Sequence, residues 1–361
     1  MSNYIEFNNK IAFHPGYYVK EIVDESGLTQ QDFAKRLDTT PKNLSILIRG
    51  EQRLSIDIAM KLSRLIGTSI DYWLNLQKSY DALIAEFNSE KELSEERKVF
   101  AYFDYKYFRD NYGLPSLPRQ IDKQIQEVRS FLHLASLRVL YKTDMFVSYR
   151  SDLESESKSP ANTVKANTMV QIATNQALQL NAPKYDRIKF EKAVDFALTL
   201  TKNHEEFYPL IKKAFWESGV CFIILPNIAG SKTNGATKKL GDNILLMVND
   251  RRLSADSFWF TLFHEIGHII NGDYGISSDE DTGTKEEAAN KFAQDSLIPS
   301  DQYQEFVHEA RFDIQSIKAF ADQINRDPGI VLGRLQNDRL VDYNDWTMKP
   351  LRHKYRVKTS V

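Results

Sequence analysis

Two histidines and a glutamate stand close together in the apolar stretch FWFTLFHEIGHIINGD, residues 258–273. His264 and His268 are four residues apart, so on one helix they share a face, with Cβ atoms about 5 to 6 Å apart. Two ring nitrogens at that spacing can bind one zinc ion, each at about 2.0 to 2.1 Å. Glu265 points about 100° away from His264 on the same helix. Its carboxylate would lie beside the ion, where it can act as general base and take a proton from water.

The same three residues also fit a packed core helix whose polar side chains find partners inside the protein. A histidine on an apolar helix face is commonly just such a core residue. However, two histidines and an acid that are desolvated together each need a partner, because an unpaired buried charge costs several kcal/mol. One metal ion would satisfy all three, which favours the zinc interpretation.

A catalytic zinc commonly has three protein ligands and leaves a fourth position to water. The segment KEEAANKFAQDSLIP predicts a helix from about Thr284 to Leu297. On this helix Glu286 falls within the apolar stripe and Glu287 falls near its polar edge. Glu286 is therefore the predicted third ligand and Glu287 the alternative, although either acid alone also fits a solvated helix face. Asn290, one turn after Glu286, is placed to hydrogen-bond a ligating histidine.

The helix that carries the two histidines is expected over residues 257–270. Asp256 is the expected N-cap, and Asn271 with Gly272 supplies the C-terminal stop. Gly267 removes a side chain close to the site, which would let a neighbouring strand or a substrate approach.

One pair of strands is expected near this helix, in GVCFIILPN (219–227) and NILLMVN (243–249). The intervening segment 228–242, rich in Gly, Lys and Thr, is predicted to be a loop, and so is the acidic segment 272–283. The strand at 243–249 either presents an exposed edge that aligns an extended peptide or is an ordinary core strand.

The chain's bulk properties exclude some classes of function. It has 361 residues, with 47 basic and 49 acidic residues, so its overall charge does not attract nucleic acid or an anionic membrane. The single cysteine, Cys221, lies in an apolar run, which predicts a buried thiol and excludes an internal disulfide. Neither a secretory leader nor a membrane-spanning run is apparent, so we expect a cytoplasmic protein without a membrane contact.

The length predicts two or three domains. Our predicted division is a helical domain at 1–80, a helical connector at 81–165 and a domain with the zinc motif at 166–361. The connector has a proline-marked break, GLPSLPRQ, and ends in the serine-rich stretch 151–163, which is predicted to be an exposed loop or linker.

Short amphipathic helices separated by polar turns are predicted from Pro15 to about Tyr80. Thr29 is the expected cap of one helix, and Thr40 followed by Pro41 opens the next. In a helix-turn-helix this later helix, Pro41 to Arg49, enters the major groove. Apolar residues of this helix face the domain core, which leaves five side chains outward: Lys42, Asn43, Ser45, Ile46 and Arg49.

Among these outward residues, Asn43 has an amide that can pair bidentately with adenine, while Lys42 and Arg49 suit phosphate or guanine. Gln30, at the start of the preceding helix, can donate to phosphate. Residues 1–78 hold ten basic and nine acidic residues, a net of only +1, so electrostatic affinity should be weak. Dimerisation would offset that weakness. A helical bundle used for protein contacts is the alternative, and Trp73 is a candidate for a dimer face or for core packing.

Three segments, FHEIGHIINGD, EEAANKFAQDSLIP and GIVLGRLQNDRLVDY, together resemble the ImmA/IrrE family of zinc metallopeptidases over roughly residues 180–350. The N-terminal helices resemble an Xre-type, HigA-like helix-turn-helix, and RSFLHLASLRVL resembles the connector of fusions between the two. The resemblance implies an α+β, mostly helical protein: a lambda-repressor-like DNA-binding domain plus a zincin-like domain with a small β-sheet.

The same resemblance implies that His264, His268 and Glu286 bind Zn²⁺ and that Glu265 is the general base. Family members often have an acid directly before the Ala-Asn pair, whereas this chain has Ala288 there. The predicted function is that of a regulator that binds a double-stranded DNA operator as a homodimer and cuts a peptide bond in a partner regulatory protein. The alternative is a non-catalytic repressor or HigA-like antitoxin whose zincin-like domain senses a ligand or a partner.

Overall fold

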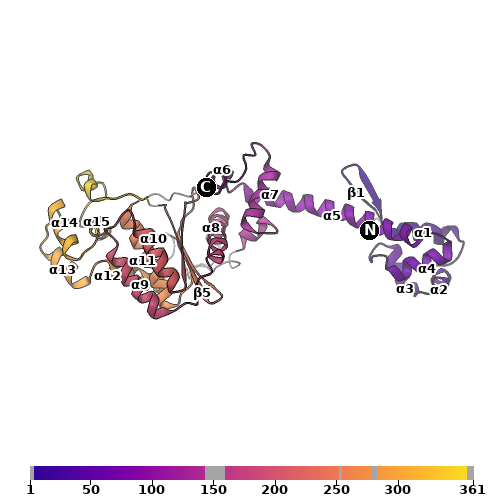
Figure 1. Ribbon diagram of the computed structural model, residues 1–361. Coiled ribbons are helices and arrows are strands. Elements are labelled where there is room, and N and C mark those ends of the chain that lie inside the picture. Colours follow the sequence, from indigo (N-terminus) through magenta and orange to yellow (C-terminus); the bar gives the residue numbers. More distant parts are fainter. Residues whose placement is uncertain (1–3, 143–158, 252–253, 279–282, 356–361) are drawn as a thin grey trace. The chain divides into compact units, whose positions relative to one another are not determined.

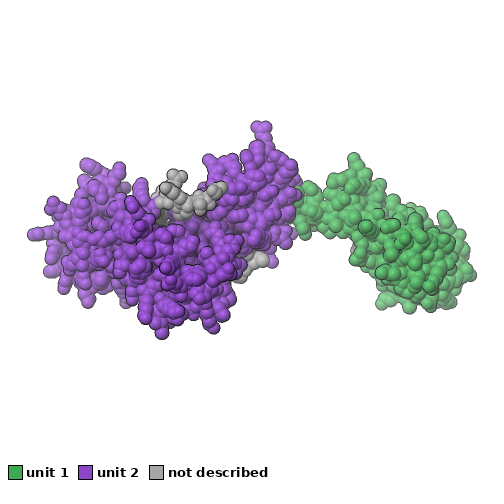
Figure 2. Space-filling model, viewed as in Figure 1, with its two compact units in different colours: residues 1–95 green, residues 96–361 purple. Residues whose placement is uncertain are grey.

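A computed structural model describes residues 4–142, 159–251, 254–278 and 283–355 of the chain. It divides into two compact units, residues 1–95 and 96–361, and each has its own hydrophobic core (Figure 1 and Figure 2). Helix α5 (Ile70–Phe100) runs from the first unit into the second. The expected boundary at residue 80 therefore falls inside a helix, and the three-part division stays a prediction.

The first unit begins with a hairpin that the sequence analysis did not predict. Strand β1 (Tyr4–Phe7) pairs antiparallel with β2 (Lys10–Phe13). The two residues between them, Asn8 and Asn9, have φ angles of 51° and 59°. Two left-handed residues make the tight turn that suits a hairpin, and asparagine tolerates that conformation better than most side chains do.

Helices follow the hairpin as predicted, and several of the predicted caps are present. Thr29 and Thr40 accept hydrogen bonds from the backbone N–H groups of Asp32 and Asn43, both at 3.1 Å. Those bonds fix the starts of the second and third helices. Before α5 the helices are α1 (Pro15–Glu25), α2 (Gln30–Arg36), α3 (Pro41–Ile48) and α4 (Ile56–Ile66).

The helices of the first unit enclose a core in which Trp73 is 1% exposed, among Val19, Leu44, Leu47 and Leu62. Its indole Nε1 donates to the hydroxyl of Thr68 at 2.8 Å. Of the two interpretations, core packing is therefore confirmed for Trp73, and a dimer or interdomain face was wrong.

The second unit combines many helices with one sheet, so the predicted α+β, mostly helical class is confirmed. Its helices are α6 (Tyr105–Tyr112), α7 (Ile121–Leu132), α8 (Pro160–Gln179), α9 (Arg187–Thr199), α10 (Phe207–Glu217), α11 (Ala255–Asn271), α12 (Thr284–Leu297), α13 (Ser300–His308), α14 (Ile314–Gln323) and α15 (Pro328–Asn337), with 3₁₀ turns η1 (Leu137–Tyr141) and η3 (Trp346–Leu351).

The break between α6 and α7 falls where the prolines predicted it. The serine-rich loop expected at 151–163 is wrong at its end, because Pro160 already starts α8 and Ser159 caps it. Residues 151–158 lie outside the part of the chain that the structure describes.

The sheet of the second unit has four strands instead of the expected two. They are β3 (Val220–Leu225), β4 (Thr233–Leu240), β5 (Asn243–Asn249) and β6 (Gly275–Ser278), in the order β3-β5-β4-β6. β3 runs parallel to β5, whereas β4 is antiparallel to both of its neighbours. The loop predictions at 228–242 and 272–283 were therefore wrong over β4 and β6.

Strand β5 is an interior strand, since β3 and β4 pair with its two sides. Its residues from Ile244 to Asn249 are all buried. Helices α8 and α11 lie on the two faces of the sheet and contact it (Figure 1). The hypothesis of a free edge at 243–249 that aligns a peptide was consequently wrong, and the segment is a core strand, next to the buried Cys221 of β3.

Helix α11 packs on the sheet and also contacts α12 and α15. It begins one residue before the expected N-cap Asp256, which lies instead in the first turn, while Ser254 holds the cap position. Its end is as predicted, because Gly272 has a left-handed φ of 76° directly after Asn271.

Gly267 of α11 was expected to let a strand or a substrate approach. The structure instead places helix α12 against it. A Cβ atom at this position would lie 3.1 Å from Cδ1 of Phe292 and 3.2 Å from Cα of Ala289. The missing side chain thus allows the two helices to approach each other closely. Among the described residues, no helix is long and apolar enough to cross a membrane.

Candidate metal centre and DNA-binding surface

Helix α11 presents His264 and His268 side by side, as their spacing predicts. Their Nε2 atoms are 3.0 Å apart, and the ring centroids are separated by 4.7 Å. His268 is fully buried and His264 is 8% exposed. Both rings therefore meet at one point in the interior, near the face that α11 turns toward α12.

Helix α12 brings Glu286 to the same point. One carboxylate oxygen, Oε2, is 3.0 Å from Nε2 of His264, and the other, Oε1, is 3.3 Å from Nε2 of His268. Glu286 is only 5% exposed, whereas its neighbour Glu287 is exposed. The structure thus places Glu286, and not Glu287, beside the imidazole pair.

Electrostatics favour a charged Glu286 carboxylate. Burial by itself would raise its pKa, but the hydrogen bonds and charges of His264 and His268 outweigh burial and hold the pKa of Glu286 well below its usual range. The carboxyl is therefore ionised at neutral pH and available as a ligand.

Asn290 of α12 orients one of the two rings. Its Oδ1 lies 2.9 Å from Nδ1 of His264. When Nδ1 donates to this amide oxygen, Nε2 keeps its lone pair and faces the other two side chains. On His268, by contrast, the buried Nδ1 has no hydrogen-bond partner among the residues that the structure describes.

This set of donors fits a zinc ion. Two imidazole nitrogens and one carboxylate form a common set of protein ligands for catalytic zinc. Ligand atoms at about 2.0 to 2.1 Å from a tetrahedral ion lie roughly 3.3 to 3.4 Å from one another. The distances between the donor atoms of His264, His268 and Glu286 are 3.0 to 3.3 Å.

Glu265 directly follows His264 in α11 and is fully buried. Above it runs strand β4, in which a Cβ atom on Gly235 would come within 2.5 Å of Oε1 and 2.7 Å of Cγ of Glu265. Gly235 therefore makes room for the glutamate. Gly235 was not predicted as a site residue, because the strand that carries it was expected to be a loop.

In the first unit, the residues predicted to bind DNA lie on α2 and α3, except that α3 ends at Ile48 and Arg49 is its C-cap. Gln30, Lys42 and Arg49 are exposed, whereas Asn43, Ser45 and Ile46 are partly buried. Most of them lie on the outward side of α3, as an amphipathic helix requires.

Two of these side chains already have partners within the unit. The amide of Asn43 donates to the hydroxyl of Thr39 at 2.9 Å, and its Oδ1 accepts from Nε2 of Gln52 at 2.6 Å. The guanidinium of Arg49 pairs with Glu51 and donates to the hydroxyl of Ser45. Asn43 would need to exchange these bonds to pair with a base.

The chain joins a helix-turn-helix unit to a unit with a cluster of two histidines and one glutamate, so the fold and the site define a regulator with a peptidase-like domain. Comparisons with known families agree with this class. Residues 19–73 match a helix-turn-helix family, and residues 226–323 match the peptidase family described as the IrrE N-terminal-like domain. The second match spans β4 to α14, and so contains the whole cluster.

Among curated proteins, the chain is similar to the helix-turn-helix-type transcriptional regulator YddM of Escherichia coli, with 37% identity over 79 residues, which are 21% of this chain and 84% of that protein. Virulence-associated protein I of Dichelobacter nodosus is 32% identical over 80 residues, 22% of this chain and 74% of that protein. A solved structure of a putative antidote protein of a plasmid maintenance system from Nostoc punctiforme is 27% identical, covers 23% of this chain and 92% of its own, and has a TM-score of 0.23.

The chain therefore belongs to the helix-turn-helix family of transcriptional regulators and carries, in addition, an IrrE-like peptidase domain.

Proposed function

We propose that the second unit is a zinc-dependent endopeptidase that hydrolyses a peptide bond in a partner regulatory protein. The observation that carries this proposal is the convergence of three donor side chains, His264, His268 and Glu286, from two helices on one buried point. The first unit binds a double-stranded operator, and the protein acts as a homodimer.

In this proposal the three convergent residues hold the zinc ion, and Asn290 fixes the ring of His264. Bound there, zinc would polarise the peptide carbonyl of the substrate and lower the pKa of water. Glu265 takes a proton from that water and passes it to the leaving amine. Its position one residue after a ligand keeps its carboxylate off the ion but beside it.

Access to the centre is from the side of His264. The side chain of His264 is 11% exposed, compared with 0% for His268 and 6% for Glu286. In this proposal a peptide approaches the centre on the side where His264 lies.

The burial of Glu265 supports a second candidate function. A general base has to reach the attacking water, yet Glu265 is 0% exposed beneath β4. A domain that stays in this closed state would bind a ligand or a partner without catalysis, as a repressor or antitoxin would.

The test is to express the protein beside its genomic neighbours and to compare it with Glu265→Gln. The amide has nearly the same shape as the carboxylate but cannot accept a proton, so the variant should keep its zinc and lose cleavage by on the order of 10²-fold or more. The control is Glu287→Gln, which removes an exposed acid and should cut as the wild type does. Retained proteolysis in Glu265→Gln would refute the assignment, and a wild type that holds zinc but yields no fragment would favour the non-catalytic function.

A further inference from the structure

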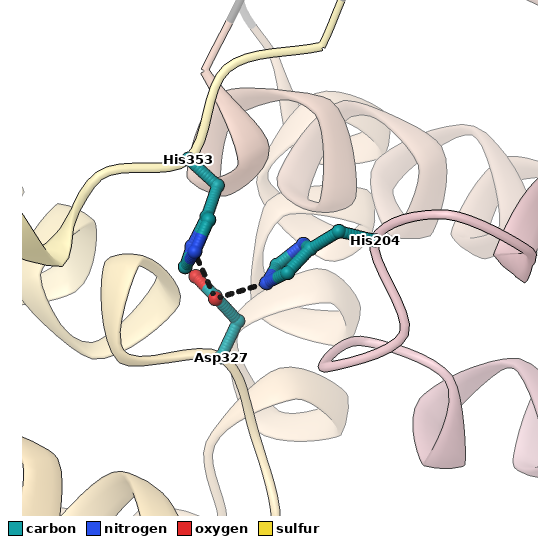
Figure 3. Close-up of side chains that lie close together, drawn as sticks. All are labelled: His204, Asp327 and His353. Carbon is teal, nitrogen blue, oxygen red and sulfur yellow. Dashed lines mark ion pairs between the residues drawn. The ribbon is translucent and has the colours of Figure 1, made fainter.

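A second cluster of side chains that could bind a metal ion lies in the second unit and shares no residue with the His264, His268 and Glu286 centre. His204 comes from the turn between α9 and α10, Asp327 is the N-cap of α15, and His353 follows η3 (Figure 3). Nε2 of His204 lies 3.2 Å from Oδ2 of Asp327, and Nδ1 of His353 lies 3.0 Å from the same oxygen. Three segments distant in sequence thus direct two ring nitrogens at one carboxylate.

The surrounding contacts hold these donor atoms in place. The other nitrogen of the His204 ring, Nδ1, lies 2.8 Å from the hydroxyl of Tyr355. The other oxygen of Asp327, Oδ1, accepts from the backbone N–H of Gly329 at 2.8 Å. Partners of this kind orient metal ligands and leave one nitrogen of His204 and one oxygen of Asp327 for the ion.

The buried carboxylate of Asp327 faces both rings through one oxygen. Asp327 is 0% exposed, and its Oδ2 lies 3.2 Å from the nitrogen of His204 and 3.0 Å from that of His353. The rings of His204 and His353 are stacked, with centroids 3.7 Å apart, so two protonated imidazoles would repel each other.

We propose that His204, Asp327 and His353 form a second metal site, which takes a divalent transition-metal ion of the zinc class. Two imidazole nitrogens and one carboxylate oxygen suit such an ion and are a poor match for Ca²⁺ or Mg²⁺, which prefer oxygen ligands. The His353 side chain is 46% exposed, so the ion can enter from solvent and keep a water ligand.

This ion would hold residues 353–355 against the start of α11, the helix that carries His264 and His268. The carbonyl of His353 accepts from the backbone N–H of Ala255 at 2.9 Å, and Lys354 forms an isolated bridge with Ser254. Nε1 of Trp259, one turn into α11, donates to the hydroxyl of Tyr355 at 3.3 Å. A metal that fixes His353 therefore stabilises the segment against which α11 begins, a structural role distinct from peptide hydrolysis.

The test counts zinc bound to the full-length protein after removal of metal and dialysis against zinc. The wild type should bind two equivalents and His353→Ala one, because the exposed His353 can be truncated without opening the core. The matched control is His308→Ala, an exposed histidine at the end of α13, which should still bind two. The proposal would be overturned if His353→Ala still bound two equivalents of zinc. It would also be overturned if the wild type bound only one equivalent and His353→Ala kept it.

A second set of variants makes the count independent of the first site. The double variant His264→Ala/His268→Ala should keep one equivalent, and adding His353→Ala should remove it. Co²⁺ bound to the double variant should give visible ligand-field bands that disappear with His353→Ala. No zinc and no such bands in a folded double variant would contradict the second site, whatever the outcome for peptidase activity.

Discussion

Individual side chains decide how the first unit would meet DNA. Arg49 is held by Glu51 and Ser45, and the amide of Asn43 is held by Thr39 and Gln52. Lys42, at the start of the same helix, is exposed. The flexible side chain of an exposed lysine can adjust to the position of a phosphate, whereas the amide of Asn43 must first exchange its hydrogen bonds to Thr39 and Gln52.

We therefore expect Lys42→Ala to weaken operator binding about equally for related sequences and to reduce the salt dependence of log K by about one for each bound subunit. The measurement is fluorescence anisotropy with labelled DNA over a range of salt concentrations. Lys20→Ala, which removes an exposed charge from α1, is the control and should change little. An unchanged salt slope in Lys42→Ala would show that this helix does not meet the phosphates.

The sequence alone could distinguish Glu286 from Glu287 as the predicted third ligand. Counting 100° per residue put Glu286 on the buried side of its helix and Glu287 at the edge, and the structure places them so. His204, Asp327 and His353 could not be found in this way, because no spacing on a single element connects them. Only the packing of the turn before α10, the cap of α15 and the segment after η3 brings them together.

At the scale of elements, helices were predicted better than strands. The bounds of α12 follow directly from its apolar stripe and the proline after it. Strand β4 was missed because its sequence, TNGATKKL, lacks the apolar alternation of a strand. β4 pairs with β5 and β6, and the sequence pattern did not reveal this pairing. Because β4 was not predicted, β5 was expected to have a free edge, which it does not have.

The close approach of β4 to α11 leads to a prediction for Gly235→Ala. The added Cβ would collide with the Glu265 side chain, so the variant should lose about 1 to 3 kcal/mol of unfolding free energy and most of any peptidase activity. Chemical denaturation measures the first effect. In a double-mutant cycle, Glu265→Ala should relieve the cost of Gly235→Ala, and additive costs would show that the two residues do not interact.

At the scale of the whole molecule, the two units have separate cores, and both candidate metal-ligating clusters found among the described residues lie in the second. A ligand that binds only the folded state stabilises the unit that holds it. Calorimetry should therefore show two unfolding transitions, and a chelator should lower the Tm of the second unit alone. The unfolding transition of the first unit is identified by comparison with a fragment of residues 1–95. Its Tm should not change with the chelator, so it serves as the internal control. Equal shifts of both transitions, or none, would argue against metal bound within the second unit.

The central claim is that one ion joins α11 to α12 through His264, His268 and Glu286. Anomalous diffraction on both sides of the zinc absorption edge, from crystals of protein purified with zinc, tests it most directly. The account predicts a zinc-specific peak within about 2.0 to 2.2 Å of both Nε2 atoms and of a Glu286 oxygen. Well-ordered side chains at these three positions with no peak between them would contradict it.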